Sequence, residues 1–302
     1  MNFSFWQAVI LLVSLLLGNQ AIANSFFRLS LGAASENNVP RGLISSDARE
    51  SEKFQAQFSG GKFYQLGLND TITVAGTVAA TRYNKMQGFD KLGVAVSADY
   101  GHRFGFGAYA PRVGAVLSLG SENFRGEARD NDLTTLEINY QQRLSPGWFF
   151  TAGIDYQSSD SESLEHHPLL TEFGYDENNS LPYELFDYES TSLFADIEYA
   201  FANEILLSTA YRRIDGHTVA STLMPTQHLY KISEAFYIDP AFDEPWYVYL
   251  LESATNEWSA AVSFPLARDS SLNIAYSWQD IEARGNRNYK NEIVSVTFVR
   301  SF

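Results

Sequence analysis

Apolar and polar side chains alternate along most of this chain, and this alternation restricts the possible fold more than any other feature. In one such stretch Leu136, Ile138 and Tyr140 are separated by polar residues. Because successive side chains of a strand point to opposite faces, a period of two predicts strands with one apolar and one polar face. No segment shows a convincing helical period of 3.6 residues. Twelve segments have the strand pattern: 25–35, 53–68, 71–83, 92–103, 112–120, 132–144, 148–158, 191–202, 204–215, 256–266, 271–283 and 291–302.

The connections between these segments alternate in length. The even-numbered ones are short, such as Asn69-Asp70 and Ser145-Pro146-Gly147. The odd-numbered ones are mostly longer and polar: 36–52, 84–91, 121–131, 159–190, 216–255 and 284–290. Short turns at one end and long loops at the other are typical of an outer-membrane barrel. We therefore predict an all-β, transmembrane, antiparallel β-barrel of twelve strands, with short periplasmic turns and long extracellular loops.

The composition agrees with a barrel and excludes several other classes. A net charge of −15 argues against a nucleic-acid partner, which needs a basic face. A mean hydropathy of −0.19 excludes a membrane protein built of many apolar helices. A closed barrel crosses lipid without such helices because it satisfies its backbone hydrogen bonds internally. The absence of cysteine removes disulfide scaffolds, thiol catalysis and cysteine-bound zinc.

The N-terminus has the pattern of a secretory signal peptide. Val9–Leu17 is an apolar run too short to span a membrane, and Ala21-Ile22-Ala23 matches an A-x-A cleavage site. We predict a signal peptide over residues 1–23 and a barrel domain over residues 24–302, exported to the cell outer membrane of a Gram-negative bacterium. A buried N-terminal helix is the alternative.

Aromatic residues fall near both ends of the predicted strands. The residues near the short-turn end are Tyr100, Tyr140, Phe201, Phe264 and Phe298. Those near the long-loop end are Tyr156, Tyr211, Trp258 and Trp278. Two such girdles are expected where aromatic rings sit at the two membrane interfaces. The simpler interpretation is that aromatic residues are common in strands.

The polar positions of the alternation predict the lining of the barrel lumen. The thirteen candidates are Arg28, Asp99, Arg103, Arg112, Glu137, Asn139, Gln141, Arg143, Asp155, Asp196, Glu198, Arg212 and Glu257. A lining of one sign would predict a path selective for the opposite ion. This set carries both signs, which leaves two alternatives: a narrow wet pore with opposed charges, or a lumen closed by salt bridges.

The last strand carries a family resemblance. It alternates through Val294, Val296 and Phe298 and ends in Phe302, which resembles the insertion signal of Gram-negative outer-membrane β-barrels. The resemblance implies that the barrel-assembly machinery is a partner during insertion, and that outer-membrane lipid and lipopolysaccharide surround the protein. Arg300 departs from the pattern, because it falls on the lipid-facing side, although an arginine near the border can snorkel to water.

A second resemblance lies after the first strand. The stretch 35–41, Ser-Glu-Asn-Asn-Val-Pro-Arg, resembles the start of the barrel module of surface-lipoprotein assembly modifiers. Those proteins also carry an N-terminal helical repeat domain and usually more strands. This sequence contains no such repeats, so the resemblance implies the barrel but not that activity.

The stretch 159–190 holds nine acidic residues and no Lys or Arg. One interpretation is attraction of divalent cations, which could bridge to lipopolysaccharide, or of a cationic solute. The other, which we favour, is a loop kept soluble by its charge. No calcium-loop spacing occurs in it.

Catalytic and cofactor motifs are weak throughout. The GxGxxA stretch 105–110 is followed by Pro111 and a strand rather than the helix of a dinucleotide site. His166-His167 point apart on an extended chain and do not form a zinc site by themselves. Asp215 and His217 could activate water, or a hydroxyl such as that of Ser221, at the rim. We expect no cofactor and no bound metal.

These observations predict a porin-like channel that transports a small solute. An outer-membrane lipid or peptide hydrolase with a rim site at Asp215 and His217 is one alternative. A structural, adhesive or secretion-assisting barrel whose long loops contact partners is the other.

Overall fold

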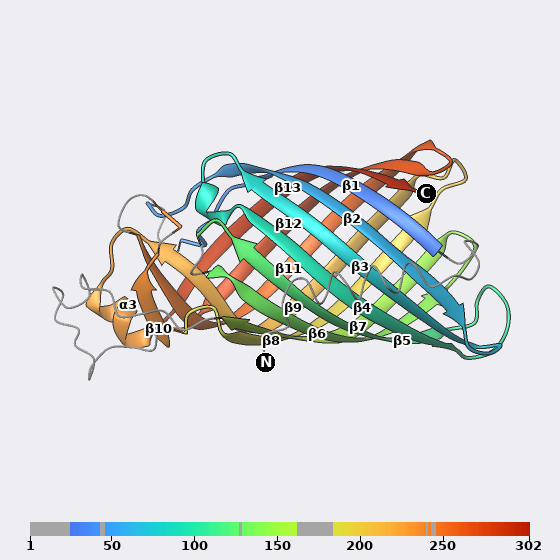
Figure 1. The fold of residues 1–302 in the computed structure, drawn as a ribbon, viewed down its shortest axis with the longest axis horizontal. Coiled ribbons are helices and arrows are strands. Elements are labelled where there is room, and N and C mark those ends of the chain that lie inside the picture. The colour runs from blue at the N-terminus through green and yellow to red at the C-terminus, as the bar shows by residue number, and fades with distance from the viewer. Residues whose placement is uncertain (1–24, 43–45, 127–128, 162–183, 240, 243–245) are drawn as a thin grey trace.

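The computed structural model describes residues 25–42, 46–126, 129–161, 184–239, 241–242 and 246–302 (Figure 1). The described chain is mainly β-strand, and its named helices are one α-helix and one short 3-10 helix, η2. The strands are β1 (Ser25–Glu36), β2 (Ser51–Gln65), β3 (Asp70–Tyr83), β4 (Lys91–Arg103), β5 (Arg112–Phe124), β6 (Asn131–Arg143), β7 (Trp148–Ser161), β8 (Tyr188–Ala200), β9 (Leu206–Thr222), β10 (Ala235–Ile238), β11 (Tyr247–Ala267), β12 (Ser270–Ala283) and β13 (Arg287–Ser301). The helices are η2 (Gln87–Phe89) and α3 (Gln227–Ile232).

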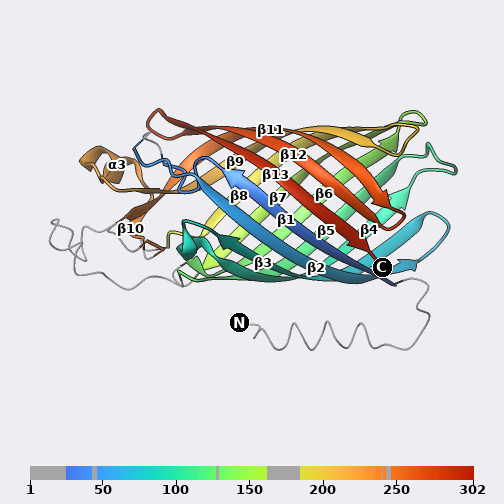
Figure 2. The same ribbon diagram turned by 90° about the horizontal axis from the view of Figure 1, so that it is seen from above.

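Twelve of these strands close into an antiparallel barrel, as predicted. Each barrel strand pairs with its neighbour in sequence, β9 pairs with β11, and β1 pairs with β13 to close the ring. The short β10 pairs only with β11 and lies outside the ring. Figures 1 and 2 show the steeply tilted strands wrapping around one axis. Closure removes the exposed sheet edges that an open sheet would present.

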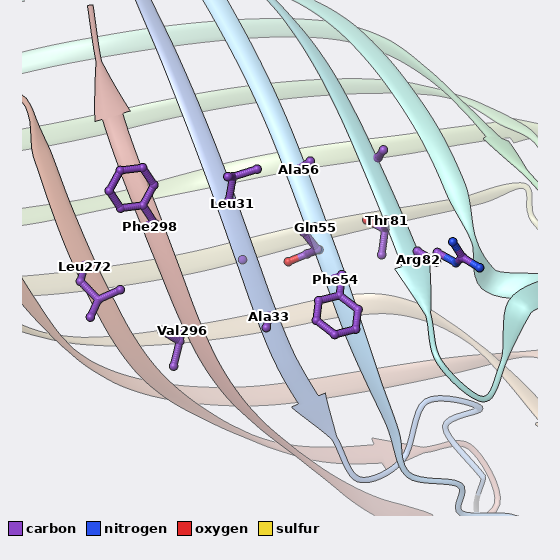
Figure 3. A pocket seen from close by; sticks show the side chains of 12 residues that line it. Leu31, Ala33, Phe54, Gln55, Ala56, Thr81, Arg82, Leu272, Val296 and Phe298 are labelled. Carbon is purple, nitrogen blue, oxygen red and sulfur yellow. The ribbon is translucent and has the colours of Figure 1, made fainter.

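The two faces of the wall differ as the alternation predicts. On the outer face Leu31 pairs with Phe298 and Ala33 with Val296, and the large apolar side chains of this face are widely exposed. The outer wall also has a shallow apolar hollow of about 550 Å³, floored by small side chains such as Ala56 (Figure 3). Because this hollow opens on the lipid-facing side, it is separate from the lumen. No helix among the described residues is long and apolar enough to span a membrane.

The connections at the two ends of the barrel differ in length less regularly than predicted. The even connections have at most eight residues, for example 144–147 between β6 and β7. We call the opposite end, with connections 37–50, 84–90 and 125–130, the outer end. Three connections of the outer end, 84–90, 125–130 and 284–286, are no longer than the longest even one, 104–111. The last shrinks to 284–286 because β13 begins at Arg287 rather than 291.

The predicted loop 216–255 is wrong. The structure continues β9 to Thr222, places α3 and β10 in the middle and begins β11 at Tyr247. Apolar and polar residues do not alternate in this segment, because both faces of the sheet are buried there. The unbroken apolar run Tyr247–Leu251 is an example. We call residues 216–255 the cap.

The aromatic residues of the outer wall form rows across neighbouring strands. Trp258 pairs with Tyr211 on one side and Trp278 on the other, and the Tyr211 and Trp258 rings lie 4.6 Å apart. Near the short-turn end, Tyr199 packs on Trp148 and Phe201. Such rows are what membrane-interface girdles look like on a barrel surface.

The cap contains the conventional hydrophobic core of the molecule. One cluster joins α3 to one face of the β9–β11 sheet through Leu229, Phe236 and Tyr249. A second cluster, on Val248 and Leu250, joins the sheet to the β7–β8 connection. Leu251, Tyr249 and Val248 are completely buried. The cap is therefore a packed substructure at the outer end of the barrel (Figure 1).

Candidate functional site: the lumen and its capped mouth

The cap lies across the outer mouth of the barrel. In the ring of twelve, β9 and β11 are six strand positions away from β3 and β4, on the opposite side. Nevertheless Phe242, in the β10–β11 connection, packs its ring 5.6 Å from that of Phe89 in the β3–β4 connection. Gly88 also lies so close to Ala241 that a side chain there would collide with its backbone, and Gly126 would place one in tight contact with it. The cap therefore reaches from one side of the mouth to the other.

A buried ion pair fastens the cap to the far wall. Arg129, in the β5–β6 connection, donates from Nη2 to Asp239 Oδ2 at 2.5 Å. The Asp239 carboxylate is fully buried and also accepts from the hydroxyl of Ser221 at 2.6 Å. The Arg129 guanidinium lies between the rings of Phe89 and Phe186, at 4.3 and 5.0 Å. A buried pair of this kind loses far more when one partner is removed than an exposed pair does.

A second set of contacts joins the cap to the β1–β2 connection. The Ser221 N–H donates to the carbonyl of Pro40 at 2.9 Å. Thr222 donates its hydroxyl proton to the buried carboxylate of Asp47. These hydrogen bonds hold residues 39–42 beneath the cap and place Arg41 inside the barrel.

Between cap and wall lies a cavity of about 320 Å³. Its lining comes from the outer ends of several strands and from the connections above them. Its charged and aromatic members include Glu36, Arg41, Lys53, Tyr83, Phe89, Lys91, Glu122, Arg129, Phe186 and Tyr188. A volume at the lower end of the usual range for ligand pockets suits a small solute.

Arg41 stands apart among these residues. Its backbone is left-handed, with φ of 54°, which is uncommon for a residue other than glycine. Its side chain is exposed to the cavity although barrel and cap surround it. Burial lowers the pKa of the guanidinium, but the side chains of Tyr289 and Tyr188 and the Glu36 carboxylate raise it more, so the net shift is upward. Arg41 is therefore a fixed positive charge inside the mouth.

A chain of side-chain hydrogen bonds runs along the inner wall below Arg41. Glu36 accepts from Lys53 and from Asn291, each at 2.9 Å. Gln279 links Asn291 to Glu257, at 3.2 and 3.1 Å. The chain therefore crosses five neighbouring strands, from β2 to β11, without leaving the inner face.

The predicted lumen residues share this inner face. The strand register puts all thirteen on the same side of the sheet as Glu36 and Lys53. Their contacts form small groups of opposite charge or matched polarity: Arg112 with Asp99 at 2.7 Å and Gln141 at 3.3 Å, Arg212 with Asp155 at 2.7 Å, and Asn139 with Glu137 at 2.7 Å. Arg28, Arg103, Arg143, Asp196 and Glu198 take part in none of the ion pairs found among the described residues.

The two candidate catalytic residues are each held by another partner. Asp215 accepts from Arg213 at 3.1 Å on the outward face of β9. His217 lies 2.9 Å from a Glu234 carboxylate oxygen. The Ser221 hydroxyl donates to Asp239 rather than to a histidine. Asp215, His217 and Ser221 therefore each contact a different side chain, Arg213, Glu234 and Asp239.

Two sequence features lie outside the described residues or are only partly within them. His166-His167, most of the acidic stretch 159–190 and the signal-peptide segment 1–23 fall in the undescribed ranges. Within the described part of the chain, no three His, Asp or Glu side chains gather as a metal site would require.

Two of the mouth residues that sequence reasoning missed, Lys91 and Glu122, lie where the predicted strands ended too early. The prediction stopped the fourth strand at 92 and the fifth at 120, whereas β4 begins at Lys91 and β5 runs to Phe124. Extending the alternation outward by one or two residues would have added Lys91 and Glu122 to the inward face. Arg41 and Arg129 lie in connections, where no periodicity could reveal them.

Comparison with known proteins supports the fold and does not assign a family. No family model matches the chain, and no curated protein matches it in sequence. Among solved structures, an outer membrane channel from Pseudomonas putida F1 is 11% identical, with 94% of this chain and 97% of that chain covered, at a TM-score of 0.60. The NanC porin is 8% identical over 90% of this chain and 98% of its own, at a TM-score of 0.48.

A third structure, the beta domain of the Bordetella autotransporter BrkA, is 10% identical over 92% of this chain and 100% of its own, at a TM-score of 0.46. At these identities the likeness concerns the fold alone, and of these three structures the channel from Pseudomonas putida F1 has the highest TM-score. Together with the closed ring of strands and the apolar outer face, it shows that this chain folds as an outer-membrane-type β-barrel.

Proposed function

We propose that this protein is an outer-membrane channel of the porin type, which passes small solutes, and that its cap limits passage at the outer mouth. The observation that carries the proposal is the cavity of about 320 Å³ beneath the cap, lined by charged and aromatic side chains. Polar groups continue on the inner face below it, from Glu36 through Asn291 to Glu257. Polar, mixed-charge linings of this kind suit hydrated solutes.

The proposal includes the route to the membrane. Residues 1–23 act as the cleaved signal peptide, and the barrel-assembly machinery reads the last strand through Val294, Val296, Phe298 and Phe302. The first three of these side chains face outward on β13, and Val294 and Val296 are widely exposed. Arg300, on the same face, pairs with Asp269 at 3.3 Å at the short-turn border, which supports the snorkelling interpretation. Lipopolysaccharide then surrounds the outer wall.

Planar-bilayer recording tests the channel. We expect the refolded protein to give discrete conductance steps, and Asp239→Ala to give larger or more frequent steps because it releases the cap from Arg129. Folding is checked independently by a mobility difference on SDS gels before and after boiling. If both proteins fold by that criterion and neither conducts, the channel function is excluded.

A further inference from the structure

The cavity under the cap is charged unevenly, and the excess is positive. Three of its four cations are each neutralised by one carboxylate: Lys53 by Glu36 at 2.9 Å, Lys91 by Glu122 at 2.6 Å and Arg129 by Asp239 at 2.5 Å. Among the described residues, no carboxylate lies within ion-pair distance of Arg41. The cavity therefore has an excess of positive charge, although the protein as a whole has a net charge of −15.

We propose that this cavity is a binding site for a small organic anion, a carboxylate in the simplest case, and that the guanidinium of Arg41 is its main charged contact. The proposal rests on the channel function above and names the class of solute at the mouth. A guanidinium presents several N–H donors in a planar fork that matches the two oxygens of a carboxylate.

Contacts within the described part of the chain leave most N–H donors of the Arg41 guanidinium unused. Among the described residues its one side-chain hydrogen bond goes from Nη1 to Thr218 Oγ1 at 3.5 Å, the outer limit for such a bond. The Thr218 hydroxyl is engaged more closely, at 2.6 Å, with the hydroxyl of Tyr289. Because this side chain is exposed to the cavity, its remaining N–H groups can donate to a solute there.

The backbone of Arg41 points to the same conclusion. Its φ of 54° is a conformation that a side chain other than that of glycine adopts at a cost. Gly42, the next residue, is not in that conformation. Strain held at a residue with an unused charged side chain is typical of a functional position. The N–H of Arg41 donates to the Asn38 carbonyl at 3.1 Å, which helps to fix the turn.

The rest of the lining suits an anion with an apolar body. Tyr83 and Tyr188 line the cavity with Arg41, and both contribute to its electrostatic environment. Phe89 and Phe186, which sandwich Arg129, supply apolar surface nearby. A solute with an anionic group at Arg41 and an apolar body against these rings would contact both kinds of side chain favourably. A cationic solute would be repelled by the excess positive charge.

Binding to the purified protein tests the site without relying on conduction. Benzoate and benzamide have nearly the same shape and differ in charge, so calorimetric titration of both isolates the charged contact. We expect benzoate but not benzamide to bind, and Arg41→Gln to weaken benzoate binding by about 10- to 100-fold, the effect of losing a hydrogen bond to a charged group. Arg41→Lys should keep part of the affinity.

Arg82→Gln is the matched control, because Arg82 is exposed at the outer end of β3 on the outward face, opposite Phe54 (Figure 3). It removes the same charge from outside the cavity and should leave benzoate binding unchanged. All variants are first shown to fold by gel mobility. Equal benzoate affinity for the wild type and Arg41→Gln, or no benzoate binding at all, would overturn the proposal.

Reversal potentials in a potassium chloride gradient separate this proposal from the channel function. If the protein conducts, we expect the ratio of chloride to potassium permeability to fall in Arg41→Gln and to stay the same in Arg82→Gln. Conduction with an unchanged ratio in Arg41→Gln would remove the anion site and keep the channel. Benzoate binding that depends on Arg41 in a protein that never conducts would keep the site and remove the channel.

Discussion

The wall of the barrel and the cap above it bury apolar side chains in opposite ways. Along the wall, residues such as Leu136 and Ile154 face outward and are widely exposed in the isolated chain. In the cap, Val248, Tyr249 and Leu251 are completely enclosed by protein. All buried hydrophobic residues among those described lie in the cap or at the outer end of the barrel. One chain therefore holds a membrane-type region and a region packed as in a water-soluble protein.

This difference separates what stabilises the two regions. The wall depends on a closed ring of backbone hydrogen bonds and on lipid around its apolar face. The cap depends on its own core and on the buried pair of Arg129 and Asp239, both of which exist without lipid. We therefore expect that the cap can unfold while the ring of strands stays closed.

The largest effect is expected at the buried ion pair. Asp239→Ala leaves Arg129 without its carboxylate and the Ser221 hydroxyl without its acceptor, so the cap should lose about 3–5 kcal/mol of stability. Hydrogen exchange should rise over β10 and the outer ends of β9 and β11. The control Asp269→Ala removes the half-exposed partner of Arg300 at the opposite end and should change little. Exchange rising equally over the whole barrel would show that cap and wall unfold together.

The core of the cap should respond almost as strongly. Leu251→Ala removes a completely buried side chain and should cost the cap about 2–5 kcal/mol, because a cavity remains. Leu136→Ala makes the same chemical change on the outer wall, where detergent or lipid fills the space. The measurement is denaturant unfolding followed by near-ultraviolet circular dichroism in detergent micelles. Similar losses at the two leucines would refute the idea that only the cap has a core of the soluble type.

The wall has its own weak point, on the side that faces lipid. Ile138→Arg places a charge on the outward face of β6 and should cost up to about 2–4 kcal/mol for folding into vesicles. The neighbouring Glu137 faces inward, so Glu137→Arg should fold nearly as well as the wild type. Folding yields in lipid vesicles, read from gel mobility, compare the two variants. A reversed order would mean that the assignment of the two faces is wrong.

The same separation explains what the sequence could predict. Apolar and polar residues alternate because one face of the wall meets lipid and the other meets water. This pattern identified all twelve wall strands. It also predicted correctly that side chains such as Asp155 and Arg212 point inward. It failed at Tyr247–Leu251, where both faces are buried and no period remains. It also missed Arg41 and Arg129, whose positions depend on contacts between connections far apart in sequence, such as Arg129 with Asp239.

The smallest effect is expected at a second Arg–Asp pair, Arg213 with Asp215, which has the same chemistry as the buried pair but lies on the rim. Its two side chains are 33% and 63% exposed, against 8% and 0% for Arg129 and Asp239. Water and salt screen the exposed pair, so a double-mutant cycle should give a coupling energy below about 1 kcal/mol. The same cycle on the buried pair should give a several-fold larger value, because either single substitution leaves a buried group without its partner. Equal coupling at the two pairs would mean that water reaches Asp239, and the cap would then be open rather than closed over the mouth.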